Sequence, residues 1–419
     1  MGKMAESPLL REVEGEREIG ISSRWDALTE ELKKVSCIAL PMVFVAISQQ
    51  LVPTVAMGML GHLGELYLSA AAIATSLTNV TGFSLLYGLS SALETLCGQA
   101  YGARQYNKLG QDPLISFEAK KYSTWLIPAL FPYAILQPLL NLGSSGAALA
   151  IALSYFLNVV LLGVYVCYSP SCNDTRISIN FSTEVYSSIW EFVRLAIPSA
   201  SMICLEWWTY EIVILLSGLL PNPQLEASVL SICLMISSLH FFIPLSIGAG
   251  ASTRISNELG AGNSEAARNV VRAVLVISIL EAVIAITALL CSRRVLGYMF
   301  SNEKEVVDYI REMVPFVCLL VLTDCIQSVL SGVVRGNGNQ HSGAYINLGS
   351  FYLVGLPVAA ILGFVAHLNG KGLWIGLNIG ATMQSILLAR ITCITDWQIQ
   401  AVRARERIFH GNCVSEVII

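Results

Sequence analysis

The chain has 419 residues, of which 54% are hydrophobic and only 13% charged, and its mean hydropathy is +0.64. Soluble domains carry about a quarter charged residues, so the composition excludes an ordinary soluble protein and predicts a membrane protein. The net charge of −4 and the pI near 5.8 give no sign of a nucleic-acid-binding surface. The eleven cysteines show neither CxxC nor metal-ligand spacing, so we interpret them as packing residues and predict no metal site.

The first 35 residues, which include "REVEGERE", contain no apolar stretch and cannot form a signal peptide. We predict a hydrophilic tail on the cytosolic side. Apolar runs of about 20 residues, the length that a membrane span needs, recur from there to residue 393, and lipid requires such runs to be helices. The ten predicted spans cover residues 36–60, 67–93, 122–141, 144–168, 190–219, 227–250, 270–291, 312–334, 343–366 and 371–393.

The distribution of basic residues predicts the orientation of these spans, because cytosolic connections are enriched in Lys and Arg. Two connections, "GHLGELYLS" and "PNPQLEA", contain no basic residue and are placed on the far side, and both termini are then cytosolic. The loop with Arg293, Arg294 and Lys304 departs from the rule. The basic residues assigned to the cytosolic side are Lys33, Lys34, Arg104, Lys108, Arg254, Arg268, Arg335, Arg403, Arg405 and Arg407.

Two segments, "GQAYGARQYNKLG" and "NELGAGNSEAARN", indicate an internal repeat of the kind found in transporters. If Gly102 and Gly260 are equivalent, Pro41 and Pro198 precede them at separations that agree to within one position. The glycines therefore mark a repeated turn between helices. A nucleotide-binding loop is disfavoured, because Glu265 occupies the third fingerprint position, no strand is predicted before the segment and no Lys-Ser/Thr follows it.

Downstream of this turn the two halves differ in length. The stretch from Gly260 to Pro315 is long enough for a full helix with its connection, whereas the matching stretch from Gly102 to Pro128 is less than half as long. The next pair of landmarks shows a second deficit of similar size, again in the first half. The first half therefore has four predicted helices and the second has six, as if the third and fifth of an ancestral twelve were missing.

Several motifs together resemble the plant branch of the multidrug and toxic compound extrusion (MATE) family: "SSALETLCGQAYGARQYNKLG", "GASTRISNELGAGNSEAARN", "CLEWWTYE", "SGVVRGNGNQ" and "DWQIQAVRARERIF". The resemblance spans nearly the whole chain. It implies an all-α polytopic membrane protein with two lobes around a central cavity, here with about ten spans where the family has twelve. It also implies an antiporter, not an enzyme, which exports organic cations, alkaloids, flavonoids or other xenobiotics by alternating access.

The resemblance further implies that a proton gradient drives transport without a cofactor, and that the protein is a monomer in the plasma membrane or the vacuolar membrane. Its partners are small organic molecules, protons and the lipid bilayer. The predicted organisation is a cytosolic tail over residues 1–35, an incomplete N-lobe over 36–168, an inter-lobe loop over 169–189, a C-lobe over 190–393 and a second cytosolic tail over 394–419.

Two carboxylates lie near the middle of predicted spans, where an ionised side chain costs a few kcal/mol even on lenient insertion scales. They are Asp324 in "LLVLTDCIQSVL" and Glu206 in "ICLEWWTYE". Burial disfavours the charged form, which makes a neutral, protonated state reachable. The resemblance implies that both residues bind protons and couple them to substrate; a structural acid bonded to a neighbouring helix is the alternative reading.

The internal repeat places neutral residues opposite these acids. Gln49 is the counterpart of Glu206, and Gln137 is the counterpart of Asp324, so we predict that the coupling site belongs to the C-lobe. Gln49, Gln137 and Asn79 are polar groups inside spans that either line the cavity or form hydrogen bonds between helices.

Tyr210 lies one turn after Glu206 and is a further candidate for the cavity wall, where aromatic faces suit a cationic or flat substrate. The neighbouring Trp207 and Trp208 fit the same role or an interfacial cluster. Four other polar residues are weaker candidates, for which structural contacts are the more frequent explanation: Glu94, Glu211, His240 and Glu281.

Two other functional classes remain open at this point. The first is a non-transporting isoform or a faulty gene model, in which the incomplete N-lobe cannot close the cavity. The second is an intramembrane enzyme, which is disfavoured because no GxSxG elbow, paired-histidine motif or acidic metal motif is present. Asn173 and Asn180 lie in glycosylation sequons, and ten spans place them on the cytosolic side.

Overall fold

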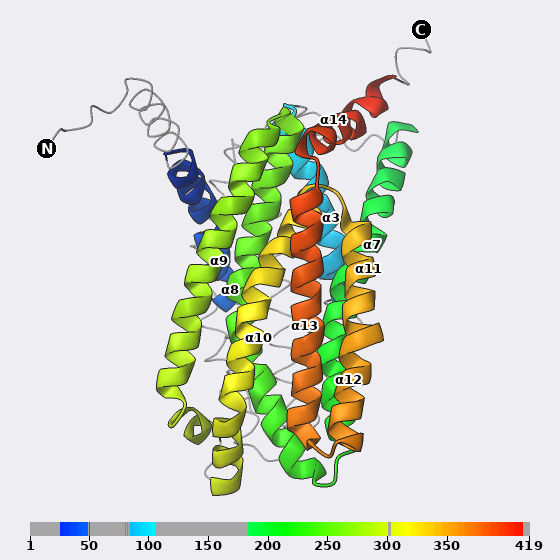
Figure 1. Cartoon of the computed structure of the whole chain (residues 1–419). Helices are drawn as coiled ribbons and strands as arrows, with labels where there is room; N and C mark the ends of the chain where they lie inside the picture. Colours follow the sequence, from blue (N-terminus) through cyan, green and yellow to red (C-terminus); the bar gives the residue numbers. More distant parts are fainter. Residues whose placement is uncertain are drawn as a thin grey trace, which may run out of the picture.

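A computed structural model describes residues 26–48, 50, 80, 82, 84–104, 183–300 and 303–413, with backbone only for 183–191 and 409–413. This part of the chain is a bundle of long helices and contains no strand (Figure 1). Its elements are a helix over 26–48, α3 (Ser84–Gly102), α7 (Thr183–Ser217), α8 (Pro223–Ala261), α9 (Ser264–Ser292), η3 (Leu296–Met299), α10 (Lys304–Gly336), α11 (Gln340–Asn347), η4 (Leu348–Gly355), α12 (Leu356–Ala360), η5 (Ile361–Val365), α13 (Asn369–Ile394) and α14 (Trp397–Cys413).

Six helices of the described part are long and apolar enough to cross a membrane. They coincide with the six spans predicted after residue 190 and confirm a multi-pass membrane protein. The helices extend beyond the predicted limits; α8, for example, runs to Ala261 where the sequence predicted an end at 250. A hydropathy pattern detects the part of a helix in hydrocarbon, whereas backbone hydrogen bonding continues into the polar ends. The predicted spans at 122–141 and 144–168 lie outside the described residues.

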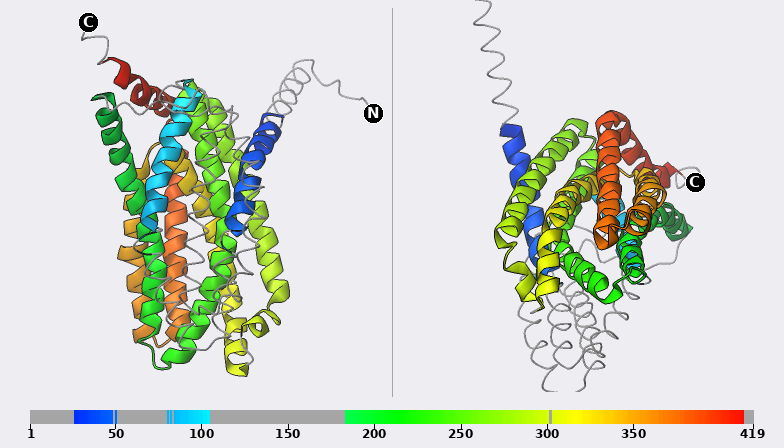
Figure 2. Two further views of the ribbon diagram at one scale, coloured as in Figure 1. Left: turned by 180° about the vertical axis from the view of Figure 1, so that it is seen from behind. Right: turned by 60° about the horizontal axis from the view of Figure 1, so that its bottom comes forward.

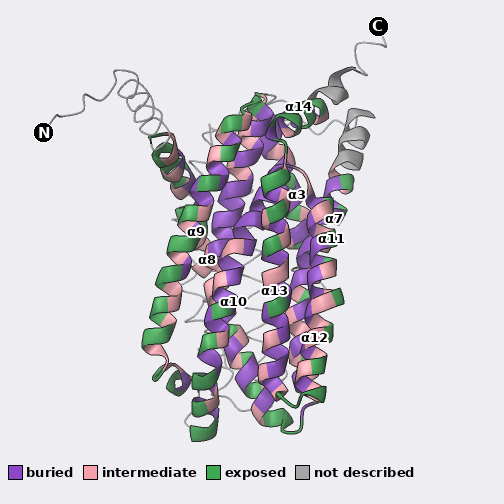
Figure 3. Cartoon of the chain, viewed as in Figure 1, coloured by how far each residue is buried: buried purple, intermediate pink, exposed green. Residues whose placement is uncertain are grey.

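The bundle has a buried centre, and its exposed residues lie on the periphery (Figure 3). In α10, 72% of the most apolar window is buried, but in α9 the share is only 17%. Apolar side chains such as Leu280 and Ile284 are exposed along α9. Exposed apolar surface of this extent suits lipid, and among the six spanning helices that the structure describes α10 is the most enclosed and α9 the most exposed.

The predicted turn between α8 and α9 is confirmed. Helix α8 ends at Ala261, Gly262 adopts a φ of 86°, and α9 starts at Ser264. The left-handed backbone at Gly262 is a conformation that glycine adopts without a steric penalty. The glycine pair therefore ends one helix and reverses the chain.

The two glycines that the repeat makes equivalent lie in the contact between α3 and α8. A Cβ atom on Gly102 of α3 would collide with the carbonyl oxygen of Asn257, and one on Gly260 of α8 would collide with the carbonyl oxygen of Gln99. Each glycine thus allows the backbone of the other half to approach it. This reciprocal contact closes the bundle between α3 and α8 at the end that carries both described termini (Figure 2).

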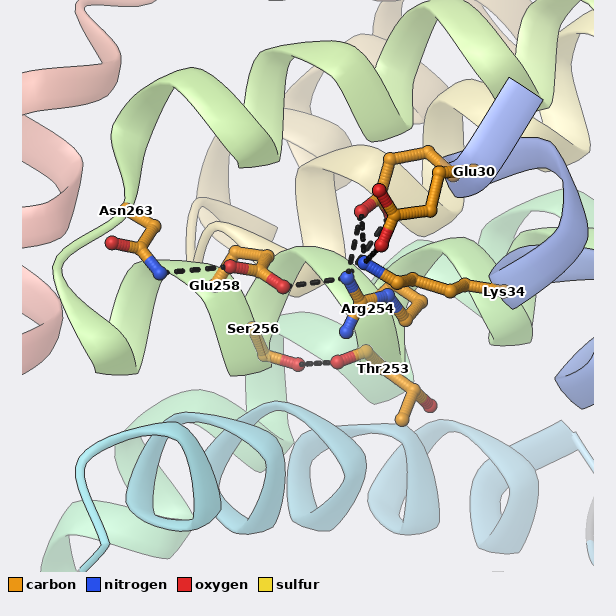
Figure 4. A network of polar contacts seen from close by, with 8 residues as sticks. Glu30, Lys34, Thr253, Arg254, Ser256, Glu258 and Asn263 are labelled. Carbon is orange, nitrogen blue, oxygen red and sulfur yellow. Dashed lines mark hydrogen bonds and ion pairs between the residues drawn. The ribbon is translucent and has the colours of Figure 1, made fainter. Parts of the chain in front are cut away.

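The first helix is already present at residue 26, so the last residues of the predicted hydrophilic tail are helical. A polar network stabilises this earlier start (Figure 4). The guanidinium of Arg254 on α8 lies 3.0 Å from Glu31 and 2.5 Å from Glu258, and all three side chains are largely buried. Lys34 pairs with Glu30 at 2.7 Å. Charged helix turns of this kind carry no hydrophobic signal, which is why the sequence pattern missed them.

The predicted C-terminal tail over 394–419 contains the helix α14 (Trp397–Cys413). Helix α14 lies across the end of the bundle (Figure 1) and buries Trp397, Ala401 and Ala404 against α8 and α9. The Arg407 guanidinium donates to the carbonyl of Asn337, 3.2 Å away, in the turn after α10. A single apolar stripe along the helix is sufficient to pack a segment of polar overall composition against the bundle.

Candidate functional site

Glu206 lies on α7 and is 6% exposed. Its carboxylate accepts three hydrogen bonds from side-chain amides, from Gln327 at 2.8 Å, Gln384 at 3.1 Å and Asn347 at 3.5 Å. The donors come from α10, α13 and the end of α11, so four helices meet at this one side chain. All three contacts are donors, which suits an anion with acceptor lone pairs on both oxygens.

Asp324 lies on α10, is 2% exposed, and accepts a hydrogen bond of 3.3 Å from the hydroxyl of Tyr210. The two helices therefore exchange contacts: α7 supplies Glu206 and Tyr210, and α10 supplies Gln327 and Asp324. Glu206 accepts from Gln327, which lies one turn after Asp324, and Asp324 accepts from Tyr210, which lies one turn after Glu206. Among the described residues, the hydrogen bonds to both carboxylates come from neutral amide and hydroxyl groups.

The amide next to Glu206 lies where the helix geometry changes. Asn347 is the last residue of α11, and the π-helical segment η4 begins at the next position. The Asn347 amide donates to the carbonyl of Met202 at 2.7 Å and accepts from Gln384 at 2.9 Å. π-Helical segments are frequent at functional sites because the wider turn reorients side chains. Here the change of geometry directly follows a residue that bonds Glu206.

A narrow pocket of about 10 Å³, room for a single water molecule, borders Glu206 between α3, α7, α8 and α10. Tyr87 of α3 and Trp207 of α7 form a stacked pair in its wall, with ring centroids 6.0 Å apart and an interplanar angle of 22°. The lining residues are Tyr87, Ile203, Glu206, Trp207, Phe241, Leu245, Gln327, Ser328, Ser331 and Arg335. Since α3 belongs to the first half of the chain, the pocket lies between the two halves and combines an acid with an aromatic face.

The pocket also contains a cation. Arg335 is 2% exposed, and its Nε and Nη2 atoms have no hydrogen-bond partner among the described residues. Gln327, Ser331 and Arg335 follow one another at intervals of four residues and so share one face of α10. At 1.5 Å per residue, Arg335 lies about 12 Å along the helix from the level of Gln327. The pocket therefore has a carboxylate at one end and a buried guanidinium at the other.

The structure places Glu206 and Tyr210 of α7 beside Gln327 and Asp324 of α10. Tyr210 bonds Asp324 and is not among the residues that line the pocket; Trp207 forms that wall instead. Trp208 is 38% exposed and donates to the carbonyl of residue 80 at 2.9 Å. Three predicted cavity residues lie outside the described residues: Gln49, Asn79 and Gln137.

The weaker candidates have structural contacts. Glu94 accepts from the hydroxyl of Thr253 on α8 at 3.0 Å, across the contact between α3 and α8. His240 and Glu281 bond each other at 2.7 Å. Sequence reasoning did not single out Gln327, Asn347 or Gln384. The available signal was that Gln327 follows Asp324 by three residues and therefore projects from a similar face.

Together, the apolar helices, the enclosed acids and the pocket between the halves define a polytopic membrane protein with the architecture of a secondary transporter. The comparisons with known proteins agree. Residues 41–117 and 198–361 match the profile of the MatE family. Protein DETOXIFICATION 12 of Arabidopsis thaliana is 47% identical over 91% of this chain and 93% of its own length.

Solved structures give the same result. The eukaryotic MATE transporter AtDTX14 is 44% identical and superimposes with a TM-score of 0.81 over 91% of this chain and 100% of that chain. A variant of the Vibrio cholerae MATE transporter VcmN is 15% identical, with a TM-score of 0.74 over 89% of this chain and 100% of that chain, which supports the fold alone. The chain belongs to the MATE family of membrane transporters and is not an enzyme.

The alignment lengths are informative as well. The match to Protein DETOXIFICATION 12 extends over 448 positions, whereas this chain has 419 residues. The relative therefore contains residues that have no counterpart here. The direction of this difference agrees with the shortened first half inferred from the repeat, and the count of ten spans stays a prediction.

Proposed function

We propose that this MATE transporter is a proton-coupled antiporter that exports organic cations, alkaloids, flavonoids or other xenobiotics by alternating access. The observation that carries the proposal is the exchange of contacts between α7 and α10, in which two buried acids are bonded by neutral donors. An acid without a basic partner can take up and release a proton without breaking an ion pair. Such an acid also provides a counter-charge for a cationic substrate.

The hydrogen bonds around Glu206 support a way for a proton to change the site. Protonation places an O–H donor among three amides that now donate, and an amide that rotates to offer its oxygen accepts that hydrogen bond. Gln384 is suited to this, because its Oε1 atom is buried and has no partner among the described residues. Its rotation removes the 2.9 Å bond to Asn347, the residue next to η4. Protonation is thereby linked to the packing of α11 and α13, and substrate and proton compete for one site.

The buried guanidinium of Arg335 favours substrates that carry a particular chemical group. A guanidinium with unsatisfied N–H groups in a low-dielectric pocket attracts an anionic or strongly electronegative group. The stacked pair of Tyr87 and Trp207 accepts a flat aromatic or cationic body. We therefore expect good substrates to be elongated aromatic molecules with a basic group at one end and an acceptor group at the other.

The test uses bacteria that lack their own efflux pumps, with export of a fluorescent cation followed under an imposed pH gradient. Asp324→Asn is expected to abolish coupled export. Glu312→Gln is the matched control, because Glu312 lies on the same helix and forms an exposed ion pair with Lys371. Dye export by Asp324→Asn with unchanged pH dependence would refute the coupling role. A folded native chain that exports nothing would instead support a non-transporting, truncated form.

A further inference from the structure

A second cluster of reactive side chains lies on the other side of α10. His240 of α8 lies 2.7 Å from Glu281 of α9, measured from Nε2 to Oε1. The thiol of Cys325 on α10 donates to Oε2 of the same carboxylate at 2.8 Å, and its sulfur lies 3.8 Å from Nε2 of His240. One nitrogen, one oxygen and one sulfur atom thus converge from three helices.

We propose that His240, Glu281 and Cys325 form a binding site for Zn²⁺ or a similar borderline-soft divalent ion. Imidazole nitrogen, carboxylate oxygen and thiolate sulfur are the three ligand types that Zn²⁺ takes in proteins, and three protein ligands leave a fourth position open. The site is separate from the coupling acids. Asp324 faces α7, whereas the adjacent Cys325 faces α8 and α9.

The geometry requires little movement. Tetrahedral bonds of about 2.0 Å to nitrogen and about 2.3 Å to sulfur place these two atoms about 3.5 Å apart, and Nε2 and Sγ are separated by 3.8 Å. The carboxylate oxygens have to move apart from both partners by roughly 0.6–0.7 Å. Rotation about the terminal bond of Glu281 provides this, because that torsion has a broad minimum.

Charge balance also favours the ion. Binding forms bonds from Nε2, a Glu281 oxygen and Sγ to the metal, and the thiol proton leaves to solvent. The carboxylate and thiolate carry two negative charges, so the complex with a divalent cation is neutral, which is the state that a membrane interior accepts. In the triad without metal, Nδ1 of His240 is buried and has no hydrogen-bond partner in the described part of the chain. Because Nε2 lies 2.7 Å from a carboxylate oxygen that only accepts, the ring proton sits on Nε2 and has to move to the unpartnered Nδ1 when Nε2 binds the ion.

The surroundings of the three ligands hold them in place. The hydroxyl of Ser278, one turn before Glu281 on α9, donates to the carbonyl of Cys325 at 2.6 Å and fixes α9 against α10. The side chains of His240 and Glu281 remain 10% and 16% exposed, whereas Cys325 is fully buried. The open side of the cluster therefore lies at His240 and Glu281, where an ion enters.

The test uses the purified full-length chain in detergent, stripped of metal with a chelator and titrated with Co²⁺. The native protein is expected to bind one ion per chain with a thiolate-to-cobalt absorption band that Zn²⁺ abolishes. Cys325→Ser is expected to lose the band, and Glu281→Gln to weaken binding at least about tenfold. Cys318→Ser is the control, since Cys318 is a second buried cysteine on α10.

Thermal unfolding in the presence of chelator shows that each variant is folded before titration. A band of equal intensity in Cys325→Ser and the native chain would assign the sulfur ligand elsewhere and overturn the proposal. So would a native chain without saturable Co²⁺ or Zn²⁺ binding, because the three residues would then be only a hydrogen-bonded cluster.

Discussion

Replacing Gly260 with alanine is expected to open the contact between α3 and α8. The new methyl group would overlap the carbonyl oxygen of Gln99, a backbone atom that cannot move aside alone. The two helices have to separate by on the order of 1 Å to restore van der Waals contact. Overpacking of this kind costs about 1–3 kcal/mol, and it applies only to the conformation in which the helices touch.

The same substitution removes a flexible residue from a helix, which stabilises α8 by about 0.5–1 kcal/mol in every conformation. Because this stabilisation applies equally to both forms, it does not change the ratio of the closed form to the open form. The overpacking cost applies only to the closed form, and about 1–3 kcal/mol corresponds to a change of about 5–150-fold in that ratio. We therefore expect Gly260→Ala to populate the form that is open at the end predicted to face the cytosol.

The rate of alkylation of Cys97, measured by mass spectrometry of its peptide, reports this shift. Cys97 is half-buried on α3, next to the residues that contact α8. Gly349→Ala is the control, because a Cβ atom at Gly349 meets no described residue within 4 Å. A rate in Gly260→Ala equal to that in the native chain and the control would refute the idea that this contact closes the transporter.

Three further predictions follow from individual contacts. Tyr210→Phe removes the hydroxyl that donates to Asp324, and the loss of a hydrogen bond to a charged group, about 1.5–3 kcal/mol, is expected to slow pH-driven dye export about tenfold or more without reducing the amount of folded protein. Gly338→Ala forces an L-residue to a φ of 80° beside Arg407, so we expect a loss of about 1–2 kcal/mol, visible as a lower unfolding temperature. Ten spans leave Asn173 and Asn180 on the cytosolic side, so an enzymatic deglycosylation assay in microsomes is expected to show no mobility shift; a shift would mean that one upstream span does not cross.

The sequence was sufficient for the large features because they depend on strong, local signals. Long apolar runs located the six helices of the C-lobe, and the cost of an acid in hydrocarbon identified Glu206 and Asp324 as residues that need an explanation. The repeat placed Gly102 and Gly260 in corresponding turns. The close approach of each glycine to the opposite helix was not predicted, because spacing along the chain carries no information about which turns pack together.

The neutral part of the site was not visible in the sequence for a related reason. Gln327, Asn347 and Gln384 come from three different helices, and a single glutamine or asparagine in an apolar run is as often an ordinary contact between helices. Cysteine spacing gives no signal for the cluster at Cys325 for the same reason, since its partners His240 and Glu281 are 85 and 44 residues away. Metal motifs detect ligands on one loop or one helix, and this cluster has one ligand on each of three.

Contacts between helices hold the described bundle together at both of its ends. At one end, α14 covers the turns after α8 and α10. At the other, Glu226 of α8 accepts from the Tyr309 hydroxyl at 2.7 Å and from the backbone N–H of Gly370 at 3.0 Å, which joins α8, α10 and the start of α13. Helices that are held at both ends are least constrained midway between them. The amides around Glu206 and the π-helical turn of η4 lie between these two ends, so the proposed proton uptake would act on the stretch of the helices that is farthest from both sets of end contacts.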